Sequence, residues 1–168
     1  MRNEHNLDDP PANSPAPGGG DTALRTPRSA LGRLLALDVG DVRIGLAVCD
    51  RDRVMASPHD QYTRRTTEKD AEYFARLVKD EQIVGLVVGL PINMDGTEGP
   101  KAKAYRQYGE WLAGVLGLPV AFMDERLTTH AAQGMLLDAG LSRQKRKERL
   151  DKLAATLILQ AYLDANRV

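Results

Sequence analysis

Carboxylates stand at places where the apolar pattern predicts that buried strands end. Asp38 follows the apolar run 34–37, and the pair Asp124 and Glu125 follows the run 120–123. A carboxylate at the end of a buried strand loses hydration unless a cation or hydrogen-bond donors meet it. Clustered carboxylates favour hard cations such as Mg²⁺ or Mn²⁺, which activate water and stabilise a leaving oxygen. The positions therefore indicate metal-assisted chemistry, provided that the fold brings them together.

A further carboxylate, Asp151, lies in the segment RLDKLAATLIL, whose apolar spacing predicts a helix. On that helix Asp151 shares a face with Ala155 and Ile158, which suits packing on a sheet. Structural alternatives remain for each acid: Asp38 as the cap of a turn, the Asp124 pair as a charged surface turn, and Asp151 as a first-turn complement to the helix dipole.

Strand side chains alternate in direction, so Asp124 and Glu125 should point to opposite faces of the sheet. The pattern alone does not choose which of the two belongs to a shared site. Arg126, directly after them, is expected to neutralise one acid or to contact a phosphate.

Basic residues are concentrated rather than spread along the chain. The whole sequence has 23 acidic and 23 basic side chains, which excludes a protein that coats nucleic acid by bulk charge. Any contact with nucleic acid must be local. Arg43, Arg126 and Lys147, together with the basic run 143–149, are the candidate contacts to a phosphate backbone, which position a substrate without reading its sequence.

Residues 1–32 are rich in Pro and Gly, and we expect a disordered tail there, followed by one α/β domain at 33–168. A single cysteine, Cys49, fits a reducing cytoplasm. No apolar stretch is long enough to cross a membrane, so we expect no membrane partner.

The elements that position the acids follow from periodicity and turn signals. The predicted order is strands at 34–37, 43–49 and 53–56 (ended by Pro58), a helix from Thr66 or Thr67 to about Asp80, a strand at 83–88, a Gly/Pro-rich loop at 89–99, a helix from Pro100 to about Leu116, a strand at 120–123, a helix from Thr128 or Thr129 to Leu137, and a last helix through 150–161. Strands that alternate with helices predict a mixed sheet covered by helices. The loop is either a ligand-binding loop after a strand or a rigid connector.

Four collinear segments resemble a known bacterial family. They are ALDVGDVRIGLAV at 36–48, VVGLPINMDGTEGP at 87–100, DERLTT at 124–129 and DKLAATLILQAYL at 151–163. The family is the Holliday-junction-resolvase-like family described as pre-16S rRNA nucleases. The resemblance implies an RNase H-like fold with a five-stranded mixed sheet, and a metal-dependent nuclease whose acids are Asp38, Glu125 and Asp151. It thus selects Glu125 over Asp124.

We therefore expect a metal-dependent nuclease that uses Mg²⁺ or Mn²⁺ and acts in 5′-end processing of pre-16S rRNA, as a monomer or homodimer. Two alternatives stay open: a Holliday junction DNA resolvase, and a module that binds nucleic acid without cutting it. A third, an actin-like ATPase, ranks last because about 135 ordered residues leave no room for a second nucleotide-enclosing domain.

Overall fold

The computed structural model describes residues 32–128 and 140–167. The strands are β1 (Arg33–Val39), β2 (Arg43–Cys49), β3 (Ala56–Thr63), β4 (Ile83–Leu90) and β5 (Val120–Asp124); the helices are α2 (Thr67–Glu81), α3 (Pro100–Leu116) and α5 (Arg143–Ala165), with a short 3₁₀ helix η2 (Glu125–Thr128). The predicted tail up to residue 31 and the predicted helix ending at Leu137, apart from Thr128, lie outside the described residues. Among the helices described, none is long and apolar enough to cross a bilayer.

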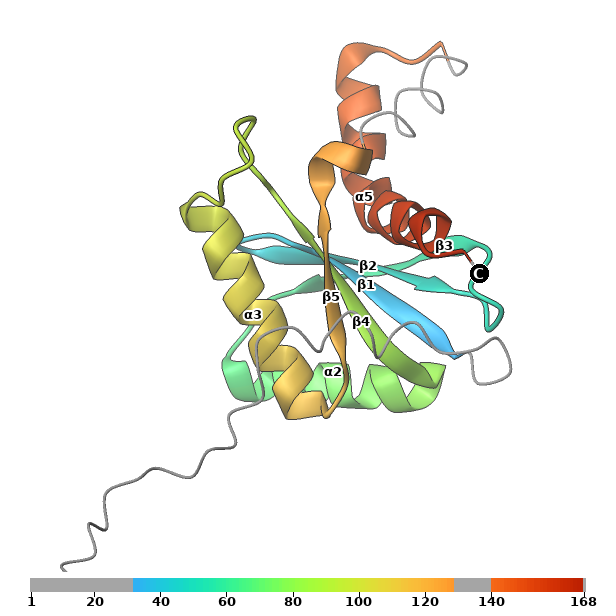
Figure 1. Ribbon diagram of the computed structural model, residues 1–168, viewed down its shortest axis with the longest axis vertical. Coiled ribbons are helices and arrows are strands. Elements are labelled where there is room, and N and C mark those ends of the chain that lie inside the picture. Colours follow the sequence, from blue (N-terminus) through green and yellow to red (C-terminus); the bar gives the residue numbers. More distant parts are fainter. Residues whose placement is uncertain (1–31, 129–139, 168) are drawn as a thin grey trace, which may run out of the picture.

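The five strands form one mixed sheet in the order β3-β2-β1-β4-β5 (Figure 1). β2 is antiparallel to both β1 and β3, whereas β4 runs parallel to β1 and β5 runs parallel to β4. The five-stranded mixed sheet that we predicted is confirmed. Because β1, β4 and β5 run in one direction, Asp38, Leu90 and Asp124 all come to the same end of the sheet.

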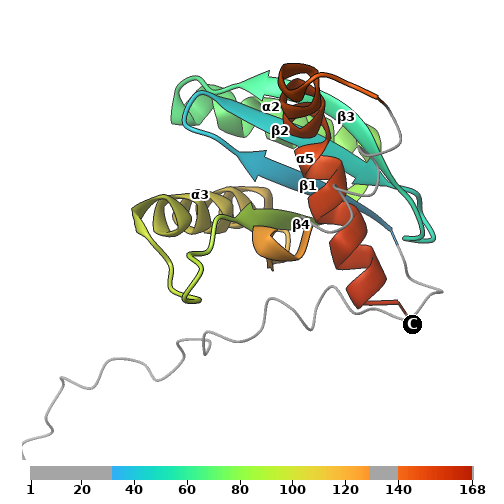
Figure 2. The ribbon, with the colours of Figure 1, turned by 90° about the horizontal axis from the view of Figure 1, so that it is seen from above.

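Helices cover both faces of the sheet, α2 and α3 on one and α5 on the other (Figures 1 and 2). Alternate residues of β1 divide between these layers. Leu35 and Leu37 pack in the core under α2 and α3, and Leu34 and Ala36 pack in the core under α5. Asp38 continues the second series, so its carboxylate lies on the α5 face.

The third strand differs from the prediction of a strand at 53–56 that Pro58 ends. β3 begins at Ala56 and continues through Pro58 to Thr63. β3 is an edge strand, and its register with β2 skips His59. A proline that donates no hydrogen bond is tolerated at such an edge and beside such a bulge, and this is why the strand does not end there.

Two further boundaries differ from the sequence prediction. β4 extends to Leu90, so the loop expected at 89–99 begins at Pro91 and Gly89 belongs to the sheet. α5 begins at Arg143, with Ser142 as its N-cap, so the basic run is helical. The other helices begin as expected: Thr66 caps α2 by accepting a hydrogen bond from the Lys69 backbone N–H at 3.3 Å, and Pro100 opens α3.

Candidate active site

Asp38 lies near the end of β1, half-buried between the sheet and α5. Its partner on β2 is Gly45, where an added Cβ would stand 3.5 Å from the Asp38 Cβ and 3.7 Å from the Ala155 Cβ. A Cβ at position 45 would therefore meet both residues in ordinary van der Waals contact, which shows that Asp38 and Ala155 both pack beside Gly45. Burial, and next the negative charge of Asp151, raise the pKa of Asp38 to about 6.

Glu125 comes directly after β5, as the first residue of η2. Gly89 on β4 leaves room for it, because a Cβ at Gly89 would stand 3.1 Å from the Glu125 Oε1. Burial raises the pKa of Glu125 to about 7, with additional contributions from the charges of Asp38 and Asp124. Glu125 and Asp38 are therefore close enough for their charges to interact.

Asp124 has the opposite environment, although it is the neighbour of Glu125. Its carboxylate accepts hydrogen bonds from the Arg126 Nε at 2.9 Å, the Arg126 Nη2 at 2.6 Å and the Arg126 backbone N–H at 2.9 Å. These bonds hold the pKa of Asp124 below its usual value. The Asp124 carboxylate is therefore engaged by Arg126, whereas the Glu125 carboxylate is half-buried and within reach of the charge of Asp38.

Asp151 reaches the site from α5. It is exposed, and one turn later the buried Ala155 packs beside Gly45. Because α5 begins at Arg143, Asp151 is more than two turns inside the helix, so the first-turn alternative is wrong. Its charge acts on Asp38, which stands between Glu125 and Asp151 in this chain of electrostatic contacts.

The three acids Asp38, Glu125 and Asp151 suit a hard divalent cation, since each would offer carboxylate oxygens and their like charges repel. Within residues 32–128 and 140–167, however, no three His, Cys, Asp or Glu side chains stand close enough to hold an ion as they lie. The structure thus places Asp38 where its charge interacts with those of Glu125 and Asp151, without closing the three acids around one point. Asp38 and Glu125 are the more preorganised part, since both are half-buried at the end of the parallel strands.

The turn after Asp38 is anchored from outside the hairpin. The Tyr105 hydroxyl donates to the Asp41 carboxylate at 3.1 Å, and the Lys101 ammonium lies 3.6 Å from it. The Arg64 Nη1 donates to the Gly40 carbonyl at 3.0 Å. These supports could not be predicted from the sequence, since nothing in the local pattern of Arg64, Lys101 or Tyr105 links them to a turn far away in the chain.

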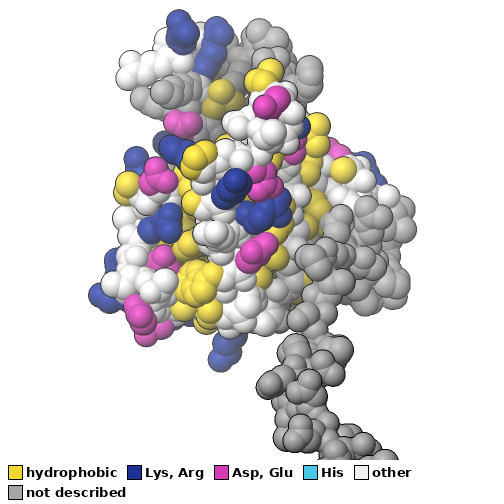
Figure 3. Space-filling model, turned by 60° about the vertical axis from the view of Figure 1, so that its left-hand side comes forward, with side chains coloured by type: hydrophobic (Ala, Val, Ile, Leu, Met, Phe, Trp, Pro, Cys, Tyr) yellow, Lys and Arg dark blue, Asp and Glu magenta, His cyan; other side chains and the backbone are white. Residues whose placement is uncertain are grey.

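The candidate phosphate contacts differ in availability. Arg43 is exposed at the start of β2, whereas the guanidinium of Arg126 is taken up by Asp124 and by the loop before α3. Lys147 lies in α5, but its side chain is outside the described part of the structure. Lys and Arg side chains gather at the top of Figure 3, the end at which α5 begins in Figure 1. Those that are described there are exposed: Arg143, Lys145, Arg146 and Arg149.

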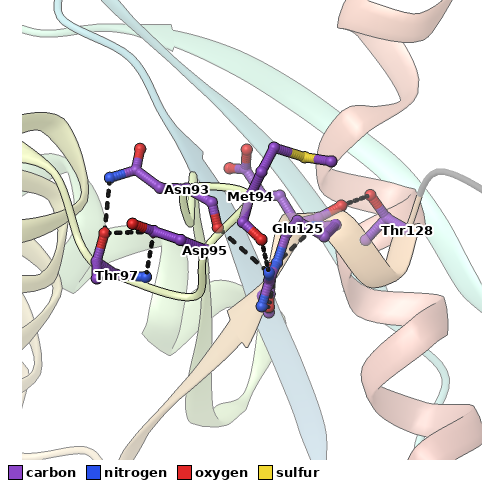
Figure 4. A network of polar contacts seen from close by, with 8 residues as sticks. Asn93, Met94, Asp95, Thr97, Glu125 and Thr128 are labelled. Carbon is purple, nitrogen blue, oxygen red and sulfur yellow. Dashed lines mark hydrogen bonds and ion pairs between the residues drawn. The ribbon is translucent and has the colours of Figure 1, made fainter.

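Arg126 connects the loop between β4 and α3 to Asp124 at the end of β5, and Figure 4 shows Asn93 and Met94 of this loop beside Glu125. The Arg126 Nη1 donates to the backbone carbonyls of Asn93 at 3.2 Å and Met94 at 3.4 Å. From the sequence this loop was predicted to be either a ligand-binding loop or a rigid connector. Its hydrogen bonds with Arg126 were not predicted. Its Asn, Asp and Gly residues indicated a structured turn, but not its partner.

Comparison with known proteins adds the family. The model of a family described as "RuvX: Holliday junction resolvase" matches residues 32–165. A Rhodopirellula baltica protein named "Putative pre-16S rRNA nuclease" is 46% identical over 138 residues, which are 82% of this chain and 80% of the relative. A Ligilactobacillus salivarius protein of the same name is 47% identical over 138 residues, covering 80% of this chain and 94% of its own.

Among solved structures, RuvC of Thermus thermophilus in complex with a Holliday junction substrate is 13% identical, with a TM-score of 0.49. The alignment covers 80% of this chain and 96% of RuvC. The family model spans every element that the structure describes and all three candidate acids, and the relatives match over four fifths of the chain. The chain belongs to the RuvX family.

Proposed function

We propose that the protein is a metal-dependent nuclease that hydrolyses phosphodiester bonds in the 5′-end processing of pre-16S rRNA in the cytoplasm. The observation that carries this proposal is the position of Asp38 and Glu125, both half-buried at the same end of the parallel strands, where burial, and next the charges of Asp151 and Asp38 respectively, raise their pKa values. A cluster that repels itself is costly to keep and is typical of a site that awaits a cation.

In this proposal Asp38, Glu125 and Asp151 hold Mg²⁺ or Mn²⁺ through their carboxylate oxygens. Bound there, the ion would polarise a phosphate oxygen and lower the pKa of a water molecule. Glu125 must be deprotonated to act as a ligand, and with a pKa of about 7 it is only partly so at neutral pH without an ion. Affinity for the ion should therefore increase with pH.

The remaining residues of the site bind and orient the substrate. Arg43, Lys147 and the basic start of α5 contact the phosphate backbone, and the expected products carry a 5′ phosphate and a 3′ hydroxyl. Arg126 acts indirectly in this proposal, because its guanidinium already holds Asp124 and the loop carbonyls.

The RNA substrate rests on the names of the curated relatives, and the family description favours a second candidate, the resolution of four-way DNA junctions. The two differ in assembly as well as in substrate. Symmetric cuts in a junction require a homodimer, whereas trimming one RNA end requires only a monomer.

The test is cleavage of a 16S rRNA precursor fragment with a 5′ extension and of a four-way DNA junction, each with Mg²⁺, Mn²⁺ or EDTA. Wild type is compared with Asp38→Asn and with Asp80→Asn, an exposed acid on α2 that serves as the matched control. We expect metal-dependent cleavage of the RNA by wild type and the control alone. Equal cleavage by Asp38→Asn would overturn the assignment of Asp38.

A non-catalytic binding module would give a different set of results. It would bind the RNA without cutting it, and calorimetric titration with Mn²⁺ would show no binding to the wild-type protein. Cleavage of the junction without cleavage of the RNA would replace rRNA processing by junction resolution.

A further inference from the structure

Met94 is the most exposed of the large apolar side chains that the structure describes, with 92% of its surface open to solvent. It lies at the tip of the loop between β4 and α3, which projects from the body of the protein in Figure 1. Single exposed apolar residues are common on proteins and need no explanation by themselves. The way in which this loop is built makes Met94 different.

The loop is held in one shape by its own hydrogen bonds. Asn93 and Thr97 are joined through the backbone at 2.9 Å and through their side chains at 3.1 Å. The Asp95 carboxylate accepts from the Thr97 hydroxyl at 2.6 Å and from its backbone N–H at 3.0 Å, and Gly96 supplies the φ of 85° that the tip requires. A tip with this many internal bonds cannot fold Met94 inward at low cost.

The loop is also held at its base and at its tip. At the base, Ile92 and Glu98 of the loop pair with each other in an isolated bridge, and Glu98 forms an ion pair with Arg106 of α3. At the tip, Arg126 binds the backbone carbonyl of Met94 itself at 3.4 Å. The residue before Arg126 is Glu125, so this bond holds the backbone of the loop tip next to the segment that carries Glu125. Figure 4 shows the Met94 side chain extending from the loop toward the side on which Glu125 and Thr128 lie.

An exposed apolar side chain on a loop tip of fixed backbone, beside the proposed nuclease site, has a physical use. The faces of nucleic-acid bases are apolar, and the polarisable thioether of methionine packs well against aromatic rings. Proteins that distort nucleic acids insert Phe, Leu, Ile, Met or Pro between neighbouring bases. Separation of two bases in a continuous duplex costs a few kcal/mol, and it costs least where a base is mismatched, damaged or already unpaired.

We propose that Met94 is a wedge that packs against a base next to the cleaved phosphate and holds that base out of its stack. The inference rests on the nuclease proposed above and narrows its substrate class. The preferred substrate has an unpaired or easily unpaired base at the cleavage site, as at a helix end, a bulge or a branch. A continuous duplex is a poor substrate, because its stacked bases leave no place for the Met94 side chain.

The first measurement is the fluorescence of 2-aminopurine, which increases when the base leaves its stack. The probe base is placed in turn at each position around the junction of a single strand and a hairpin stem in RNA. Binding is followed with Asp38→Asn, which should leave the RNA uncut, alone and combined with Met94→Ala. Met55→Ala is the matched control, because Met55 is 65% exposed and lies in the turn before β3.

We expect binding by Asp38→Asn to increase the fluorescence at one position, and we expect Met94→Ala to abolish that increase while Met55→Ala leaves it unchanged. In the active protein, the ratio of kcat/KM for this RNA to that for a continuous duplex should decrease about tenfold in Met94→Ala, as loss of burial of a methionine side chain implies. In Met94→Leu this ratio of kcat/KM values should stay close to that of wild type, because leucine offers a similar apolar volume.

The results separate this inference from the nuclease proposal. Wild-type cleavage with an unchanged ratio and unchanged fluorescence in Met94→Ala would overturn the wedge and leave the nuclease in place. A fluorescence increase that depends on Met94, with no cleavage by wild type, would support the wedge and overturn the nuclease. Absence of both signals would overturn both.

Discussion

Asp124 and Glu125 are neighbours in the chain, yet their carboxylates stand in opposite electrostatic environments. The Arg126 guanidinium binds Asp124 and lowers the pKa of that acid, whereas burial and the charge of Asp38 raise the pKa of Glu125 to about 7. Asp124 thereby fixes Arg126, and Arg126 fixes the loop carbonyls of Asn93 and Met94. The Glu125 carboxylate instead interacts with the charge of Asp38.

This difference predicts unequal effects of two similar substitutions. Glu125→Gln keeps the shape of the side chain and removes a ligand, so kcat should decrease by roughly 100-fold or more. Asp124→Asn weakens only the support of the site, for which a loss of about 10- to 100-fold is usual. Steady-state cleavage of the RNA substrate measures both, with Asp80→Asn as the control. A larger loss in Asp124→Asn than in Glu125→Gln would exchange the roles of the two acids.

The opposite environments of these acids show how much of the site can be predicted from the sequence. Strand alternation predicted that Asp124 and Glu125 would point to different faces, but β5 ends at Asp124 and Glu125 begins η2, so alternation does not extend to Glu125. Which of them meets Asp38 depends on β1, β4 and β5 coming together, and the pattern contains no information on that register. The resemblance to the family supplied Glu125, and the structure supports the choice through the contacts of Asp124 with Arg126.

In the core, Asp70 is likewise a residue whose contacts cannot be predicted from the local sequence pattern. Its position early in α2 is typical of an exposed acid that complements the helix dipole. It is instead 2% exposed and accepts hydrogen bonds from the Tyr62 hydroxyl at 2.7 Å and the Tyr108 hydroxyl at 3.0 Å. These tyrosines come from β3 and α3, so only the tertiary fold reveals them as partners. The apolar runs of β1, β2, β4 and β5, in contrast, were sufficient to predict those strands because burial along a strand is a local pattern.

The raised pKa of Asp38 predicts that the acid destabilises the metal-free protein at high pH. The folded-state pKa of about 6 lies above the unfolded value of 3.8, so folding favours the protonated form of Asp38. The stability that protonated Asp38 contributes is fully present below pH 3.8 and is lost as the pH rises through 6. Asp38→Asn cannot ionise, so it should be more stable than wild type by roughly 1–3 kcal/mol at pH 8, and the difference should be small near pH 4.

Urea denaturation in EDTA at the two pH values measures this difference. Asp80→Asn should follow wild type at both, because Asp80 is exposed on the opposite face of the sheet. If Asp38→Asn were less stable than wild type at pH 8, the carboxylate would be contributing a favourable contact, and the description of the acids as mutually repelling would be wrong.

Binding of divalent ions should offset the destabilisation that ionised Asp38 causes in the metal-free protein. At pH 7.5, Mg²⁺ or Mn²⁺ at about 100 times its Kd should stabilise the folded protein by about 2.7 kcal/mol, seen as an increase in Tm. The increase should shrink at pH 5, because the pKa values of about 6 and 7 leave Asp38 and Glu125 largely protonated there. Differential scanning calorimetry measures Tm, and Asp38→Asn should lose the response. An equal response in Asp38→Asn would place the ion elsewhere.

Gly89 is predicted to be essential for packing and for the site at the same time. A Cβ there would stand 2.4 Å from the Ile158 Cδ1 and 3.1 Å from the Glu125 Oε1, so Gly89→Ala must displace the Ile158 side chain or the helix that carries it, and it crowds Glu125. The overpacking should cost about 1–3 kcal/mol in the free energy of unfolding. Gly114→Ala is the matched control, because its added Cβ meets nothing within 4 Å and alanine suits a helix interior better than glycine.

A second substitution separates the two effects of Gly89→Ala. Ile158→Val shortens the side chain that collides with the new Cβ, so the double variant should regain part of the lost stability, which chemical denaturation measures. Cleavage should stay impaired in the double variant, because the crowding of Glu125 by the Cβ at position 89 remains. Full recovery of both stability and cleavage would show that Gly89 serves only the packing of α5 on β4 and has no role in positioning Glu125.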